Sequence, residues 1–399
     1  MWSVLDSTGA AKGTTATGWS ILDSTGTIKE VSSGSSSTTI DASDVIDFDE
    51  DAVYAVSKAL SDSGTIQWDH DAEGGGRLVA NFTDYYPRTP GGRLTLTSAT
   101  PVMVSEAAAQ TTIYYTPYTD DVIFLHDGTS LKPFQFTEVS IAMASSAEWA
   151  SGSNYDLYMF YDAGTIRLVT GSAWSTDTAR SESLTRVHGM WHNAATMTGR
   201  YSASSTVSVP ALRGLYVGTF RASANGTTTW ELGGTAAGGD PGFLYLWNCY
   251  NRVTVGLHVL DSTDTWTNTA GTNGPRNGST SNRVNFVLGL AECLVKATHA
   301  AGGELIANAD VAAAYIGFGL DSTTSMITLT SFYATDAAAT STGTVFPVLV
   351  AETSHLGLLG FHYLQATERG ATGGTGTVTF YGDGGATYIQ FGISFEGTF

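Results

Sequence analysis

His188 and His192 are four residues apart, the spacing that places two zinc ligands on one face of a helix. Residues four apart also share one face of a strand, so this spacing does not by itself require a helix. Gly189 disfavours a helix between them, and no glutamate follows His188 as it does in helical zinc-protease motifs. The sequence therefore favours an interpretation in which the two histidines lie in a strand-rich segment and bind no metal.

Two acidic clusters carry the hard oxygen ligands that divalent cations prefer. One is Trp68–Glu73, and the other is formed by the acidic residues between Asp41 and Asp51. Neither has the regular acidic spacing and final glutamate of an EF-hand loop. We interpret the first as a solvated turn and the second as the acidic start of a helix, and cation binding stays open as the alternative.

Two pairs of carboxylates lie near tryptophans, an arrangement that glycan-cleaving enzymes use. They are Asp261 and Asp264 near Trp266, and Glu138 and Glu148 near Trp149. Catalysis would require a fixed distance between the two carboxyl groups of a pair, and sequence does not supply that distance. The chain also lacks the regular short repeat of a long β-helix.

Motifs of other enzyme classes are absent from the sequence. There is no Gly-x-Ser-x-Gly nucleophile elbow and no phosphate-binding loop of the Walker type. We therefore predict that the chain is not an enzyme. No catalytic, cofactor-binding or metal-binding residue is assigned, no cofactor is expected, and the binding residues stay unknown.

Cys249 and Cys293 are too few for a disulfide framework or a thiolate metal cage. Both lie in apolar stretches that resemble strands, so we expect buried thiols. A single bridge between them stays open, because sequence does not give their distance in space.

The composition favours a β-rich protein with many tight turns. The chain has 399 residues, of which 46 are glycine, and 42% of its residues are hydrophobic while 14% are charged. A disordered chain would combine low hydrophobicity with high charge, so a packed core is expected. The formal net charge of -19 would repel DNA and anionic lipid, and it predicts no nucleic-acid partner. The sequence also predicts no leader peptide and no membrane insertion, because no apolar run has the required length.

The region 1–92 is expected to be a short attachment region. Trp2–Gly9 recurs as Trp19–Gly26, and each copy is typical of a short strand that ends in an Asp-Ser-Thr-Gly turn. Asp47–Leu60 carries acidic residues at its start and a lysine near its end, which matches a helix dipole and predicts one helix.

From Arg93 onward, short segments rich in β-branched and aromatic residues alternate with turn residues roughly every ten residues. This pattern predicts antiparallel β-sandwich domains, of jelly-roll-like type, at 93–212 and 213–399, and a division near Asn268–Asn282 is the alternative. One hairpin is expected at Asp156–Thr170 and another at Tyr216–Leu232. Asn268–Asn282, rich in Gly, Asn and Thr, is expected to be an exposed loop.

Eight ordered blocks resemble those of one known protein family. They are Tyr114–Tyr118, Asp121–Gly128, Asn154–Phe160, Leu215–Arg221, Phe243–Val253, Val259–Trp266, Asn282–Leu290 and Gly317–Thr323. Together they extend from about Thr111 to the C-terminus, and they are similar to blocks of tailed-bacteriophage virion structural proteins, which are described as tail-fibre or tail-associated proteins.

The resemblance implies a structural component of the virion, assembled in the host cytoplasm, with a tail-fibre, baseplate or collar position favoured. It implies other virion proteins as partners, a homo-oligomer with a trimer favoured, and a host-surface glycan or protein as a further partner. A capsid decoration protein is one alternative, and a tail-associated polysaccharide-degrading enzyme is another.

Overall fold

A computed structural model describes residues 88–308, 311–335, 342–345, 347–370, 377–385 and 390–399, and the backbone of short strands before residue 82. It likewise describes only the backbone at 306–308, 311–312, 332–335 and 342–345. The chain divides into two compact units, Met1–Tyr85 and Tyr86–Phe399.

The first unit contains small antiparallel strand pairs. They are β1 (Val4–Leu5) with β2 (Ala11–Lys12), β3 (Ser32–Ser33) with β4 (Ser36–Ser37), and β5 (Thr65–His70) with β6 (Gly76–Asn81). The helix predicted at Asp47–Leu60 and the second copy of the N-terminal repeat lie outside the described residues.

The second unit begins with the first sheet, which has 11 strands and is mostly antiparallel. Its main path is β15 (Leu184–Val187), β16 (Met190–Asn193), β19 (Leu215–Arg221), β13 (Asn154–Asp162), β14 (Thr165–Ala173), β17 (Met197–Ser202), β12 (Val139–Ala142), β9 (Thr112–Pro117) and β7 (Gly92–Thr95). At its sides, β18 (Ser205–Val209) pairs with β17, and β23 (Leu246–Asn248) pairs with β19. β10 (Val122–His126) and β11 (Leu131–Gln135) form a separate hairpin.

The second sheet has eight strands. They are β30 (Thr328–Thr335), β29 (Val311–Leu320), β33 (Gly360–Arg369), β27 (Arg283–Leu288), β22 (Gly242–Leu244), β20 (Thr228–Leu232) and β8 (Ala107–Gln110), with β26 (Gly274–Pro275) beside β33. A short 3-10 turn, η2 (Arg276–Gly278), follows β26.

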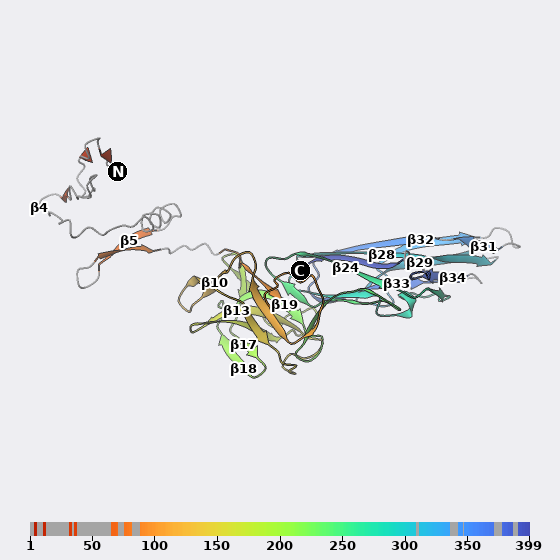
Figure 1. Cartoon of the computed structure of the whole chain (residues 1–399), viewed down its shortest axis with the longest axis horizontal. Helices are drawn as coiled ribbons and strands as arrows, with labels where there is room; N and C mark the ends of the chain where they lie inside the picture. Colours follow the sequence, from red (N-terminus) through yellow and green to blue (C-terminus); the bar gives the residue numbers. More distant parts are fainter. Residues whose placement is uncertain are drawn as a thin grey trace. The chain divides into compact units, whose positions relative to one another are not determined.

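The third sheet also has eight strands, and the long β28 is at its centre. They are β21 (Thr235–Ala236), β24 (Thr254–Asp261), β35 (Gly392–Thr398), β28 (Leu294–Asn308), β34 (Thr377–Tyr381) and β25 (Thr265–Asn268), with β31 (Thr342–Val345) and β32 (Val348–Leu356) paired to β28. Figure 1 shows the long strands β28, β29, β32 and β33 extending side by side.

One hydrophobic core joins the three sheets, because it contains buried residues from each of them. Phe286 of β27 and Phe395 of β35 are in contact across the second and third sheets, with ring centroids 5.5 Å apart. A second, smaller core lies between β29 and the strands β28, β32 and β34, and includes Ile316, Leu349 and Phe380. Strands dominate the described residues, which confirms the prediction of a mainly β chain.

The hairpin expected at Asp156–Thr170 is confirmed. β13 pairs with β14 up to Asp162 and Thr165, and the two intervening residues, Ala163 and Gly164, both have positive φ. Two consecutive residues with positive φ are typical of the turn that matches the twist of paired strands.

The prediction of a hairpin between Tyr216 and Leu232 is wrong. β19 lies in the first sheet, whereas β20 lies in the second and pairs with β22 and β8. The tight turn at Ala224–Thr227 therefore carries the chain from one sheet to the other. Both segments are rich in apolar and β-branched residues, and local pattern does not specify which strand is the partner.

The expected division of the chain into one domain at 93–212 and another at 213–399 stays a prediction. β19 begins after residue 212 and lies between β16 and β13, so strands from both sides of that residue share the first sheet.

Candidate functional site

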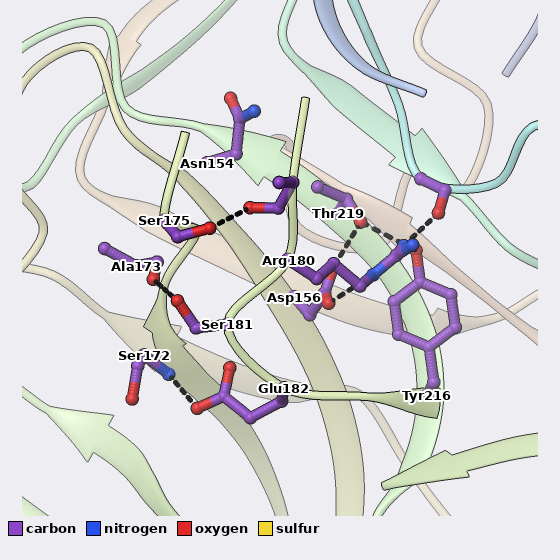
Figure 2. Close-up of polar contacts among 12 residues, drawn as sticks. Asn154, Asp156, Ser172, Ala173, Ser175, Arg180, Ser181, Glu182, Tyr216 and Thr219 are labelled. Atoms are coloured by element: carbon purple, nitrogen blue, oxygen red, sulfur yellow. Dashed lines mark hydrogen bonds and ion pairs between the residues drawn. The ribbon is translucent and has the colours of Figure 1, made fainter. Parts of the chain in front are cut away.

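The most connected polar cluster lies where the loop after β14 crosses the first sheet. Asp156 of β13 is opposite Thr219 of β19 in the strand register, and its side chain is 1% exposed. The loop brings Arg180 onto this pair, as Figure 2 shows, and Arg180 Nε donates to Asp156 Oδ2 at 2.7 Å. Thr219 Oγ1 donates to Asp156 Oδ1 at 2.6 Å, so both carboxylate oxygens have a donor.

Arg180 also connects this cluster to the second sheet. Its Nη2 donates to the hydroxyl of Tyr216 at 3.0 Å and to the carbonyl of Gly289, which follows β27. The guanidinium lies 4.5 Å from the ring centroid of Trp174. At Gly289 the backbone approaches the rings of Tyr216 and Trp247 so closely that a Cβ would overlap with both. Glycine is therefore needed at this contact between the sheets.

The electrostatics of this cluster favour a charged arginine. Burial disfavours the guanidinium charge, but the nearby Tyr216 hydroxyl and Asp156 carboxylate raise the pKa of Arg180 above its ordinary value. A guanidinium that donates to a carboxylate makes a strong, directional hydrogen bond. Every partner is internal, so the arrangement fixes a loop and offers no group to a substrate.

The rest of the loop is held by further hydrogen bonds, several of which Figure 2 draws. Glu182 Oε1 accepts from the Ser172 amide at 2.9 Å, and Ser181 Oγ donates to the Ala173 carbonyl at 2.6 Å. At the far end, Arg221 forms an ion pair with Asp177 at 2.8 Å. The loop is thus fixed to β14 and β19 along its length.

A second buried cluster surrounds Arg276, which is fully buried in η2. Its Nη1 lies 3.0 Å from His299 Nε2, and its Nη2 donates to the Tyr381 carbonyl at 3.1 Å. Because a guanidinium can only donate, His299 Nε2 accepts, and the ring proton on Nδ1 points to the carbonyl of Gly317 at 3.2 Å. Burial, and then the charge of Arg276, lowers the pKa of His299 to about 3.

Glu368 borders the Arg276 cluster. It accepts from Trp266 Nε1 at 2.8 Å and from Asn268 Nδ2 at 2.9 Å, and burial raises its pKa. Trp266 lies with its ring centroid 5.0 Å from the Arg276 guanidinium carbon. Asn268 and Arg276 fall within the segment expected to be an exposed loop. The prediction is wrong at Arg276 and Asn282, which are 0% exposed, because their side chains fasten the segment to the third sheet and to the loop before β22.

Asp261 and Asp264, which the sequence brings near Trp266, do different things. Asp261 is buried, and it accepts from the amides of Gly238 and Thr263 and from the side chain of Asn282. Burial raises the pKa of Asp261, but these hydrogen bonds lower it by a larger amount. The pKa of Asp261 therefore lies below its ordinary value. Asp264 is exposed in a turn. Asp261 therefore holds a loop with its lone pairs.

Glu138 and Glu148 likewise have separate structural partners. Glu138 accepts from the Ser98 hydroxyl and the Ala99 amide, both at 2.6 Å, and from Thr116. Glu148 pairs with Arg200 at 2.5 Å. Trp149, the aromatic residue considered beside them, is fully buried and donates from Nε1 to Thr170 Oγ1 at 3.0 Å.

The histidine pair is split by a turn. His188 is exposed with φ of 48° between β15 and β16, whereas His192 is 1% exposed in β16. Burial lowers the pKa of His192 to about 4, and its Nδ1 faces the Met190 carbonyl at 3.2 Å. Among the described residues, no group of three or more His, Cys, Asp or Glu is arranged to hold a metal ion. Asp71–Glu73 and the acidic residues at 41–51 lie outside those residues.

Cys249 and Cys293 are both buried and are not bridged. Burial raises the pKa of Cys249 to about 12. Cys293 Sγ accepts from Arg252 Nη1 at 3.0 Å, and Arg252 also pairs with Glu292 at 2.8 Å. The expectation of buried thiols is confirmed, and the open question of a bridge is answered by two free cysteines.

Sequence reasoning missed both arginine clusters. Arg180 lies in a Ser- and Thr-rich loop and Arg276 in a Gly- and Asn-rich one, surroundings typical of exposed turns. No local signal identifies Asp156 or His299 as their partners, because each pairing depends on where a loop or turn lies against a sheet.

Comparison of the sequence with family models and with curated proteins found no relative. No family model matches the chain, and no curated protein matches it either. Among the described residues, no helix has the length and hydropathy needed to cross a bilayer.

Proposed function

We propose that this chain is a structural component of a bacteriophage virion, in a tail-fibre, baseplate or collar position, where it presents a surface for host attachment or particle assembly. The proposal rests on where the family-like blocks lie in the fold. Leu215–Arg221 forms β19, Phe243–Val253 contains β23, and Asn282–Leu290 contains β27. These strands are almost entirely buried and meet around Trp247 and Gly289.

This location supports a shared scaffold. Residues that join the first sheet to the second determine how the sheets are held, so a resemblance concentrated there concerns architecture. We propose sandwich domains of jelly-roll-like type for this scaffold, and the core between β29 and the third sheet supports face-to-face sheet packing. The region 1–92 is proposed as the attachment region.

The chemistry of the acidic residues supports a non-enzymatic role. Glu138, Asp156 and Asp261 use their oxygens to hold backbone amides, hydroxyls and side chains in place. The net charge of -19 keeps an exposed particle surface soluble and is unsuited to binding nucleic acid. We propose other virion proteins as partners, with a host-surface glycan or protein as a further partner, and a homo-oligomer assembled in the host cytoplasm.

Immunogold electron microscopy of phage particles that encode this chain tests the proposal. Label at the tail fibre, baseplate or collar is the expected result. Label spread over the capsid would replace it with the decoration role, and particles that carry no label would overturn it. Depolymerisation of host polysaccharide by the purified chain, abolished by replacing one carboxylate, would establish the enzyme instead.

A further inference from the structure

Strand β32 carries large apolar side chains on the face that the chain leaves open to solvent. Leu349 and Ala351 point inward and are buried, whereas Val348, Val350 and Leu356 are 68%, 46% and 72% exposed. An antiparallel strand with one solvated face carries polar residues on that face, while a strand covered on both faces reads as a continuous apolar run. β32 begins with a run of the second kind, Val348–Ala351, and ends on the exposed Leu356.

The neighbouring strand extends this surface. In the register of β28 and β32, Leu294 is opposite Leu356, and Ala300 is opposite Val350. Leu294 is itself 41% exposed. We use the name β28–β32 face for the outward residues of the two strands: Leu294, Lys296, Thr298, Ala300, Val348, Val350, Glu352, Ser354 and Leu356.

The face continues onto the start of β30. Ile327 and Leu329 are 45% and 58% exposed. Thr330 Oγ1 donates to the Val350 carbonyl at 2.8 Å, which holds β30 beside β32. An open groove runs between Ile327 and the central residues of the two strands, including Lys296 and Glu352. Exposed apolar patches bordered by polar residues mark interaction sites on soluble proteins.

Two opposite charges lie at the centre of the face. Lys296 is opposite Ser354, and Glu352 is opposite Thr298. The lysine and the glutamate therefore lie diagonally across from each other, in successive cross-strand pairs of this face. None of the ion pairs among the described residues includes either of them. A lysine is notable here, because the chain carries only 18 Lys and Arg against 37 Asp and Glu.

This pattern is complementary to itself. A two-fold axis parallel to the strands places β28 of one copy over β32 of the other. Leu294 then meets Leu356 of the second copy, and Lys296 lies beside Glu352 of the second copy, with each contact made twice. An isologous contact requires this matching of a surface with its own rotated image.

We propose that the β28–β32 face packs against the same face of a second copy of this chain. Apolar ends then exclude water on both sides of two central lysine–glutamate pairs, and the two sheets stack face to face as in a sandwich. The pairing goes beyond the virion role and does not depend on it. It also predicts an even number of chains, where the family resemblance implies a trimer.

Sedimentation velocity of the full chain over a range of concentrations tests the pairing. The wild type is expected to form dimers, and Val350→Lys or Leu356→Lys is expected to raise the dissociation constant at least tenfold, because each places an unpaired charge in the contact. Val104→Lys is the matched control, since Val104 is 77% exposed and lies outside the face. It should leave the dimer unchanged.

Charge exchange provides a sharper test. Lys296→Glu alone and Glu352→Lys alone should each dissociate the dimer, because each produces like charges across the contact. A mixture of the two single variants should form a heterodimer, since each altered side chain then meets an opposite charge on the other copy. Within one chain, residues 296 and 352 carry like charges in both variants, and mixing does not change that. Recovery of a dimer on mixing therefore reports contact between copies.

Three results would overturn the pairing. They are a wild type that is monomeric at all concentrations, an oligomer that withstands all four substitutions, and a mixture of charge variants that stays monomeric. Particle labelling is unaffected by these outcomes, so the virion role is tested separately.

Discussion

Two internal arginines of this protein, the largely buried Arg180 and the fully buried Arg276, are stabilised by different kinds of partner. Arg180 meets the carboxyl group of Asp156, and the pKa of Arg180 is raised. Burial raises the pKa of Asp156 as well, although the charge of Arg180 opposes that shift. Arg276 meets a neutral imidazole, His299, and two backbone carbonyls, and burial lowers its pKa to about 10. Both fasten a loop to a sheet.

The difference concerns where the compensating charge lies. The Asp156 carboxylate is 2.7 Å from Arg180, so removing either partner leaves the other as an uncompensated buried charge. Glu368 is the nearest acidic influence on Arg276, yet its oxygen is occupied by Trp266 and Asn268. Loss of Arg276 therefore leaves acceptors without donors but no isolated partner charge.

The largest effect is expected from Arg180→Met. The substitution leaves the Asp156 carboxylate buried without its cation, which costs about 3–5 kcal/mol of unfolding free energy. Denaturant titration measures the loss. The double variant Arg180→Met with Asp156→Asn should recover part of it, because no buried charge is left unpaired. A loss below about 1 kcal/mol in the single variant would show that water reaches Asp156 or that its carboxyl, whose pKa burial raises, becomes protonated.

Sequence predicted the kind of fold better than it predicted which strands and side chains meet. The alternation at Asp156–Thr170 predicts a hairpin because its two-residue turn is local. The pairing of Tyr216–Leu232 was wrong because β19 finds its partners in the first sheet and β20 in the second. Strand partners are selected by the whole core, which a local pattern does not contain.

The same limit applies to the polar clusters. Acidic residues near tryptophans suggested catalytic pairs, but Asp261 and Glu138 each hold separate loops. Two internal cations, Arg180 and Arg276, come from segments whose composition is that of exposed turns. Composition predicts the solvent exposure of an average loop, whereas these loops are fixed by side-chain contacts with distant strands.

Arg276→Met should have a smaller effect than Arg180→Met. It removes the donors of His299, Ala300 and Tyr381, and the loss of hydrogen bonds from a charged group costs about 1.5–3 kcal/mol. Relief of the buried guanidinium charge offsets part of that cost. Denaturant titration beside Arg180→Met gives the ranking. If Arg276→Met is the more damaging of the two, the comparison is reversed.

The Arg276 cluster should also make stability depend on pH. His299 has an ordinary pKa of 6.5 and a folded pKa of about 3, so between these values the unfolded chain binds more protons. Above pH 6.5 the His299 ring is neutral in both states and does not reduce the unfolding free energy. As the solution is acidified from pH 6.5 toward pH 3, the unfolding free energy falls by about 1.4 kcal/mol per pH unit because of this ring.

Comparing His299→Gln with the wild type isolates this contribution. The unfolding free energy of the variant should fall less steeply between pH 6.5 and pH 4 than that of the wild type. His188→Gln, at an exposed turn, is the matched control and should leave the slope unchanged. Parallel slopes for wild type and His299→Gln would mean that the ring is protonated in the folded protein.

The smallest effect is expected from an arginine that lies in solvent. Arg88 pairs with Asp120 at 3.8 Å, and the two side chains are 73% and 38% exposed. Water screens such a pair and the long side chain keeps its freedom, so Arg88→Ala should change the unfolding free energy by less than about 0.5 kcal/mol. Denaturant titration in low and high salt measures the change. A loss comparable to that of Arg276→Met would mean that burial is not what separates the two internal arginines from this one.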